Sequence, residues 1–176
     1  MKIIKIIVLL FYTILPISII SATTLSVDKK TDFYNILPIS SVFIDNSKKL
    51  TIDDIQNKNI EFKLNDKKLL GYGYSPNFNV WVKVSLKNNS SKTISKILEY
   101  DNALTTDIEF YKHINGKYYQ IKEGLLHLDK NRTTIKPIFK ITLNPNETKI
   151  YYIKTTSYIT TLTYRCIYKE IRRERG

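Results

Sequence analysis

Aromatic and basic side chains are the residues of this chain that are best suited to chemistry. The sequence has 13 Tyr, 7 Phe and one Trp, against two His and one Cys. Trp81 stands two residues before Lys83, in a stretch that alternates apolar and polar residues. An aromatic ring beside a cation on one face of a strand is a platform on which flat or sugar-like ligands stack. The composition therefore favours a binding site over a reaction centre.

The candidate ligand-binding residues come from expected strands and from one polar loop. They are Trp81, Lys83, Tyr100, Tyr111 and Arg132. Each tyrosine has an alternative role, because tyrosine also packs well on a pleated surface. Trp81 lies opposite an apolar face of four residues, so its alternative is burial beneath a loop. The pattern leaves both alternatives open.

Motifs of catalysis and metal binding are missing from the sequence. It has no G-x-S-x-G elbow, no Gly-rich phosphate loop and no H-E-x-x-H pair. His113 and His127 have no Cys or carboxylate at ligand spacing, which favours ordinary histidines over metal ligands. Cys166 falls within an apolar pattern as a small buried residue, with pairing to another chain as the alternative. We expect no enzymatic activity, no metal and no cofactor.

Asn131 is a candidate for glycosylation. It begins an Asn-x-Thr acceptor whose acidic residue, Asp129, lies two positions upstream. This arrangement resembles the extended acceptor of bacterial N-glycosylation, and it falls in a polar loop. Chance matches are common in an Asn-rich sequence, so an unmodified loop is the alternative.

The basic charge does not indicate nucleic-acid binding. There are 28 Lys and Arg against 16 Asp and Glu, a net charge of +12. Nucleic-acid binders gather such residues on one face, whereas these lysines are scattered singly or in pairs. We expect no nucleic-acid partner, and an attraction to anionic lipid or envelope polymer. The dense cluster of arginines at 172–175 is most simply a frayed tail.

The first 22 residues have the pattern of a secretory signal peptide. Lys2 and Lys5 precede an apolar stretch over residues 6–20, and small residues end at Ala22. The stretch is shorter than the roughly 20 residues of a spanning helix, and Pro16 would kink one. Cleavage after Ala22 is the preferred interpretation, and an uncleaved anchor is the alternative. Either places the rest of the chain outside the cytoplasm, in the periplasm or on the outer face of the inner membrane.

Short strands and turns dominate the remainder. Period-two alternation predicts a strand over residues 80–87, and the Asn115-Gly116 pair predicts a tight hairpin between strands at 107–114 and 117–121. Further strands are expected at 97–100, 137–143, 150–154 and 161–168. Thr51, with an acid three residues on, predicts one helical turn. No later segment reaches the length of a membrane span.

These elements indicate one all-β domain, an antiparallel β-sandwich with a single core and a short N-terminal helical turn. We expect a signal peptide at 1–22, a lead segment at 23–40 that is loosely ordered over its first ten residues, the sandwich at 41–168 and a basic tail at 169–176.

The ordered series of motifs resembles a known sensory family. In the strand at 80–88 a Trp is followed two residues later by a basic residue, and the strand closes at Asn88. The other matching pieces are residues 42–45, 50–55, 71–75, 98–102, 107–111, Gly124, Pro137-x-Phe139 and 151–153. Together they are similar to the second DISM-type extracellular domain of bacterial seven-transmembrane receptors with diverse intracellular signalling modules.

The resemblance implies a jelly-roll β-sandwich similar to carbohydrate-binding modules. It implies a sensor that binds a small molecule or saccharide, with a membrane receptor as partner. Lys83 stands where the family usually has Arg. A planar guanidinium that can make two parallel hydrogen bonds to a carboxylate is thus replaced by a compact ammonium charge. The resemblance implies membrane helices and an output module after such a domain, and we expect neither in residues 169–176, so the chain is expected to be a truncated receptor, a fragment or a free-standing periplasmic binding protein. The alternative is a non-catalytic protein–protein interaction module of the envelope.

Overall fold

Strand β6 (Asn79–Asn88) lies at the centre of the larger of two facing sheets. The computed structural model describes residues 24–27, 33–128 and 134–170. The expected signal peptide at 1–22, the candidates Asn131 and Arg132, and residues 171–176 lie outside the described residues. The larger sheet contains β1 (Thr24–Val27), β3 (Ser41–Asp45), β4 (Lys63–Leu64), β6, β8 (Asp107–Ile114), β9 (Lys117–Glu123) and β11 (Thr148–Thr156).

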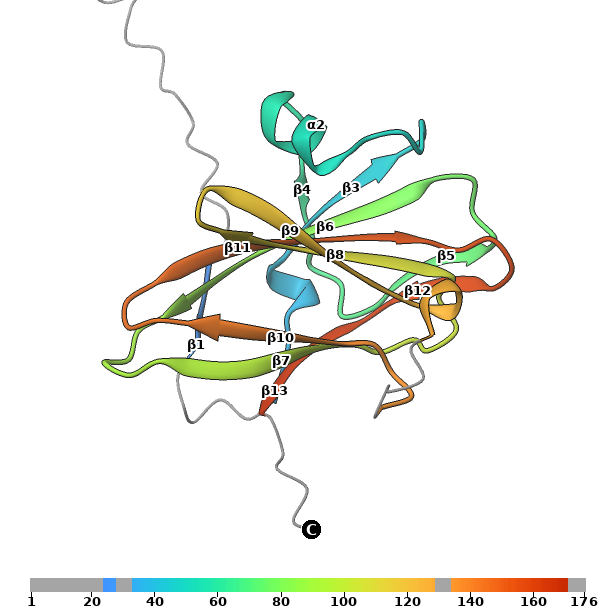
Figure 1. Cartoon of the computed structure of the whole chain (residues 1–176). Coiled ribbons are helices and arrows are strands. Elements are labelled where there is room, and N and C mark those ends of the chain that lie inside the picture. Colours follow the sequence, from blue (N-terminus) through green and yellow to red (C-terminus); the bar gives the residue numbers. More distant parts are fainter. Residues whose placement is uncertain (1–23, 28–32, 129–133, 171–176) are drawn as a thin grey trace, which may run out of the picture.

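A second sheet lies below the first in the view of Figure 1. It contains β2 (Phe33–Asn35), β7 (Ile94–Tyr100), β10 (Ile138–Leu143) and β13 (Cys166–Glu170). A two-stranded ribbon joins β5 (Leu70–Tyr74) to β12 (Thr161–Tyr164). The helical elements are short: η1 (Leu37–Ile39), α2 (Ile52–Asn57) and η2 (Leu125–His127). No helix within the described ranges is long and apolar enough to cross a membrane.

The expected all-β class, the antiparallel pairing and the short N-terminal helix are confirmed. The jelly-roll connectivity and the likeness to carbohydrate-binding modules stay predictions. The Asn-Gly hairpin is also confirmed, because Asn115 has a φ of 49° and Gly116 a φ of 80° between β8 and β9. Both values are the positive ones that a type I′ turn requires.

The main core lies between the two sheets. The apolar face of β6, with Val80, Val82, Val84 and Leu86, meets residues of β7 and β10 there. The Phe110 ring stacks on the Phe139 ring with centroids 4.6 Å apart, and this contact links β8 to β10. Full burial of such a side chain contributes about 1.5–3 kcal/mol.

A second apolar cluster lies on the other face of the larger sheet, so the expectation of a single core is wrong. Its fully or nearly buried members are Ile55, Trp81, Tyr111 and Tyr152. Residues 50–62, which contain α2, pack on them, and we call this segment the α2 cover. In Figure 1, α2 stands on the side of the larger sheet that faces away from β7, β10 and β13. A sheet that is buried on both faces needs two apolar layers.

The α2 cover begins with the predicted capping box. The Thr51 hydroxyl accepts a hydrogen bond from the Asp54 backbone N–H at 3.2 Å, and the Asp54 carboxylate accepts one from the Thr51 N–H at 2.9 Å. The Lys58 ammonium lies 2.8 Å from the same carboxylate. These contacts satisfy the first free backbone donors of the helix.

The C-terminal strand differs from the prediction. The sequence predicts one strand over 161–168, whereas the chain breaks at Arg165 into β12, which pairs with β5, and β13, which pairs with β7 and β2. Tyr164 and Cys166 are both completely buried. The period of two therefore continues across the break and hides the change of sheet.

The described part of residues 23–40 contributes strands to both sheets. Strand β1 pairs in parallel with β6, and Val27 at its end has no exposed surface. Strand β2 pairs with β13. The loosely ordered start that the polar composition predicts does not hold for residues 24–27, because their backbone pairs with β6 and the side chains of Leu25 and Val27 pack in the main core.

Gly124 is a position where only glycine fits. Its φ is 113°, and an added Cβ would lie 2.8 Å from the carbonyl oxygens of Thr105 and Thr106. We predict that Gly124→Ala lowers the free energy of unfolding by about 1–3 kcal/mol from backbone strain alone, with a further loss from the clash. Urea denaturation measures it. The control is Gly71→Ala, since an added Cβ at Gly71 meets nothing within 4 Å. Equal effects of the two substitutions would contradict the prediction.

Candidate functional site

Trp81 is completely buried. Its indole stacks on the Tyr111 ring with centroids 5.6 Å apart and planes 19° apart. The α2 cover lies over this pair, and the Lys154 ammonium is 5.6 Å from the indole centroid. A ring without exposed surface cannot stack on a ligand that arrives from solvent. The alternative of burial beneath a loop is therefore the arrangement found for Trp81.

Three other candidate ligand-binding residues also pack against other parts of the protein. Tyr100 lies in the core between the sheets, where its hydroxyl donates to the Thr163 carbonyl at 2.8 Å. The Tyr111 side chain is buried against Trp81. Lys83 is half-buried on the face of Trp81, with its ammonium 5.9 Å from the Phe62 ring. The structure thus brings Trp81, Lys83 and Tyr111 together, but it places Tyr100 on the other side of the sheet. The prediction of ligand contact is corrected for Trp81, Tyr100 and Tyr111, because packing uses their surfaces.

A charged network continues this face beyond the α2 cover. The Tyr111 hydroxyl donates to the Glu109 carboxylate and accepts a hydrogen bond from the Gln120 amide at 2.9 Å. The Lys154 ammonium lies 3.4 Å from the same carboxylate. Burial alone would raise the pKa of Glu109, but the Tyr111 hydrogen bond and the charges of Lys154 and Lys122 outweigh it and leave the pKa below its ordinary value of 4.5. Glu109 is therefore ionised, and it holds Tyr111 against Trp81.

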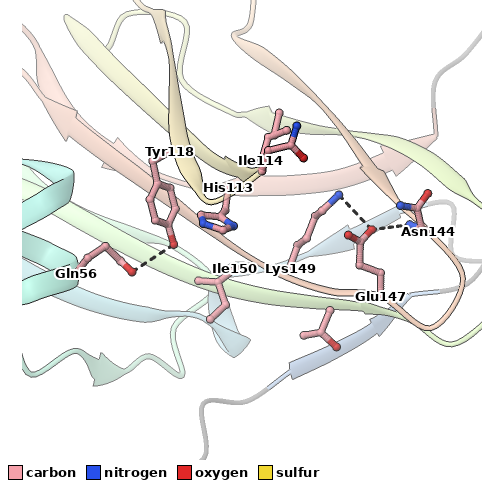
Figure 2. A pocket seen from close by; sticks show the side chains of 10 residues that line it. Gln56, His113, Ile114, Tyr118, Asn144, Glu147, Lys149 and Ile150 are labelled. Carbon is pink, nitrogen blue, oxygen red and sulfur yellow. Dashed lines mark hydrogen bonds and ion pairs between the residues drawn. The ribbon is translucent and has the colours of Figure 1, made fainter.

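An open cavity of about 570 Å³ lies beside the aromatic cluster. Three elements far apart in the sequence form its walls: α2, the β8–β9 hairpin and the turn into β11 (Figure 2). The lining residues are Gln56, His113, Ile114, Asn115, Tyr118, Asn144, Glu147, Thr148, Lys149 and Ile150. Most of them are polar, and they present amides, a phenol, an imidazole, a carboxylate and an ammonium group.

Tyr118 belongs to both the cavity and the buried cluster. Its hydroxyl donates to the Gln56 amide oxygen at 3.4 Å. Its ring lies 5.0 Å from the His113 ring on one side and 5.8 Å from the Tyr152 ring on the other. Burial, together with the neighbouring Tyr152, raises the pKa of Tyr118 to about 12. The phenol therefore stays protonated and offers both a donor and an acceptor at the cavity wall.

The opposite wall carries an ion pair, drawn with dashed lines in Figure 2. The Lys149 ammonium lies 3.1 Å from the Glu147 carboxylate, which also accepts a hydrogen bond from the Asn144 backbone N–H at 2.7 Å. Burial alone would raise the pKa of Glu147, but the Asn144 N–H and Lys149 outweigh it and lower the pKa. The wall therefore presents a fixed acceptor and a fixed cation.

The sequence pattern does not single out these cavity residues as a site. The pattern indicates an ordinary histidine at position 113, and Tyr118 falls in the predicted strand at 117–121 with no signal of its own. The hairpin register was the available signal, since a turn at Asn115-Gly116 pairs His113 with Tyr118 on one face. Nothing local connects Gln56 or Glu147 to this hairpin, because their proximity comes from tertiary packing.

Comparison with known proteins identifies one matching family. A family model described as 7TMR-DISM extracellular 2 matches residues 38–164. No curated protein sequence matches the chain.

Solved structures also include matches, among them the functional form of the mosquito-larvicidal Cry4Aa toxin from Bacillus thuringiensis. The toxin is 10% identical, and the aligned part covers 60% of this chain and 21% of the toxin chain, with a TM-score of 0.32. The chain thus spans about a fifth of the toxin's length. A likeness at this level carries no argument about fold or function.

The buried carboxylate of Glu109 makes stability depend on pH. A pKa that is lower in the folded than in the unfolded state stabilises the fold above the unfolded value, and this stability is lost as the pH falls through the folded value. We predict that Glu109→Gln lowers the free energy of unfolding by about 1.5–3 kcal/mol at pH 7, the range for a hydrogen bond to a charged group. The difference from wild type should shrink below about pH 4.5. Urea denaturation at several pH values measures it.

The matched control is Glu61→Gln, which changes an exposed carboxylate on the α2 cover. It should leave the free energy of unfolding nearly unchanged at every pH measured. A pH-independent loss for Glu109→Gln would show that the charge of Glu109 contributes nothing.

Proposed function

The chain belongs to the 7TMR-DISM extracellular 2 family, and on that premise we propose that it binds a small polar molecule, a saccharide in the first instance, in the cavity between α2 and the β8–β9 hairpin. The family consists of extracellular domains of seven-transmembrane receptors, so the chain has an extracellular, sensory role. The signal-peptide pattern of residues 1–22 supports export to the periplasm or to the outer face of the inner membrane. Neither an enzymatic activity nor a cofactor is part of the proposal.

The cavity is the observation that carries this function. Its volume of about 570 Å³ lies within the roughly 300–1,000 Å³ of small-molecule sites. Its walls offer the donors and acceptors that hydroxyl groups require, and the half-buried ring of Tyr118 lies between them. Sugars combine polar hydroxyls with apolar C–H faces, and such faces pack on aromatic rings.

The position of Tyr118 suggests how occupancy reaches the rest of the domain. A ligand that takes the Tyr118 hydroxyl as partner competes with Gln56 of α2. It would also contact the Tyr118 ring, which packs on Tyr152 of the buried cluster. Binding at the cavity would therefore change the contacts of the α2 cover.

An alternative function is a protein–protein interaction module of the envelope. Exposed aromatic side chains such as Tyr74 (72%) and Tyr119 (50%) favour it, whereas the completely buried Trp81 can contact neither a ligand nor a protein partner. This module would show a stoichiometric protein partner on periplasmic crosslinking and no small ligand.

Ligand binding can be tested with the chain from residue 23 onward. A thermal-shift panel of metabolites and a glycan array should identify at least one stabilising compound. We predict that Tyr118→Phe weakens the binding of this compound about twofold to twelvefold, which corresponds to the loss of one hydrogen bond of about 0.5–1.5 kcal/mol. Isothermal titration measures the affinity. The ring stays in place, so the aromatic contacts with His113 and Tyr152 are kept.

Tyr119→Phe is the matched control, since Tyr119 is the next residue of β9, half exposed, and does not line the cavity. It should leave the affinity unchanged. A ligand that binds both variants and Glu147→Ala with wild-type affinity would place the binding site elsewhere, and a panel without any hit would favour the interaction module.

A further inference from the structure

Large apolar side chains are exposed on loops at one end of the sandwich. Leu104 lies between β7 and β8, Leu126 lies in η2, and Tyr158 and Ile159 form the turn from β11 to β12. Tyr74 ends β5 beside that turn. Their exposed fractions are between 50% and 72%. We call these five residues the loop-tip patch.

Hydrogen bonds hold the loops of this patch together. The backbone N–H of Tyr158 donates to the Thr106 hydroxyl at 3.0 Å, and the Leu126 N–H donates to the Thr106 carbonyl at 3.1 Å. The Thr160 hydroxyl donates to the Leu104 carbonyl at 2.8 Å. The tips are therefore neighbours, although the residues come from distant parts of the chain.

Further hydrogen bonds between these loops pair polar groups whose transfer to an apolar environment would otherwise cost free energy. The Ser75 N–H donates to the Thr160 carbonyl at 3.0 Å, and the Ser75 hydroxyl donates to the Tyr158 carbonyl at 2.6 Å. Unsatisfied peptide groups cost several kcal/mol in hydrocarbon, whereas internally bonded ones do not. These loop tips can therefore approach a region that is poor in water.

A lysine adjoins the patch. The Lys48 ammonium lies 5.5 Å from the centroid of the Tyr158 ring and donates to the Asn77 amide oxygen at 3.2 Å. Within the part of the chain that the structure describes, no carboxylate pairs with it. Lysine beside a tip aromatic combines an apolar stem with a charge that reaches the headgroup level.

Two carboxylates at this end have side-chain partners among the described residues. Asp107 lies 3.0 Å from the His127 imidazole. Asp101 pairs with Lys136 and lies 3.3 Å from the Arg165 guanidinium. These contacts and the net charge of +12 limit the electrostatic repulsion between this end and an anionic surface.

We propose that the loop-tip patch docks on the surface of an anionic membrane, with the apolar tips in the boundary between headgroups and acyl chains and Lys48 on lipid phosphate. Separate tips that project from several loops fit a soft surface. A protein partner would require about 800 Å² of continuous, complementary face. The family's extracellular placement in a membrane receptor brings such a surface within reach.

The docking surface and the ligand cavity lie at opposite ends of β11. Thr148 at the start of this strand lines the cavity, and Thr156 at its end leads into the patch. A strand of nine residues spans about 30 Å. In Figure 1 the turn from β11 to β12 lies at the same end as β5. Failure of one site therefore says nothing about the other.

Flotation of the chain from residue 23 onward with vesicles tests the proposal. We expect binding to vesicles of phosphatidylglycerol and phosphatidylethanolamine, and much weaker binding to phosphatidylcholine alone. The double substitution Leu126→Ser with Ile159→Ser should reduce the partition coefficient about tenfold or more, since each withdraws a large apolar side chain. Lys48→Glu should reduce binding about threefold on the anionic vesicles only.

The control is the double substitution Leu64→Ser with Leu69→Ser, whose side chains are exposed to a similar extent, 56% and 55%, but lie outside the patch. It should bind like wild type, and urea denaturation should show all variants folded. Absence of vesicle binding by wild type would overturn the proposal. Equal losses in both double variants, or binding that depends on Lys48 but not on Leu126 and Ile159, would do the same. Self-association that the patch substitutions abolish, without vesicle binding, would instead show an interface between proteins.

Discussion

The burial of β6 on both faces is the constraint on which the rest of this structure depends. Val82 points into the core between the sheets, Trp81 points into the cluster beneath α2, and neither has exposed surface. A shift of β6 by one residue would place the Trp81 indole in the space that Val82 fills and a valine in the space that the indole fills. Both apolar layers would then be badly packed. The strands that pair with β6 therefore inherit one register. They are β1, β3 and β11.

The second apolar layer connects this constraint to the candidate site. Trp81 and Tyr111 are stacked under the α2 cover, and Glu109 with Lys154 fixes Tyr111 from the open side. Tyr118 extends the layer to the cavity. The aromatic residues that suggested a ligand platform thus support a site that lies beside them. Burial gives them this role, because a fully covered ring contributes packing energy and positions its neighbours.

Three strands outside the matched range complete the described domain. The family model covers residues 38–164, whereas β1, β2 and β13 lie beyond it. Strand β13 is flanked by β7 and β2 in the second sheet, and Tyr168 in it is completely buried. Without β13 the core would lose one wall and β7 would lose a neighbour. The structural unit of this chain is therefore longer than its family match.

Local signals in the sequence determined most of the strands, the Asn115-Gly116 hairpin and the capped turn at Thr51, because period, turn conformation and capping each involve residues close along the chain. The family resemblance rested on these signals in order, and the family match agrees with it. Only the tertiary structure decided that the chain changes sheets at Arg165, that the α2 cover buries Trp81, and that Gln56, Tyr118 and Glu147 share one cavity. Each of these outcomes joins segments that are distant in the sequence, and the period of two is the same whether a face meets solvent, another sheet or a covering segment.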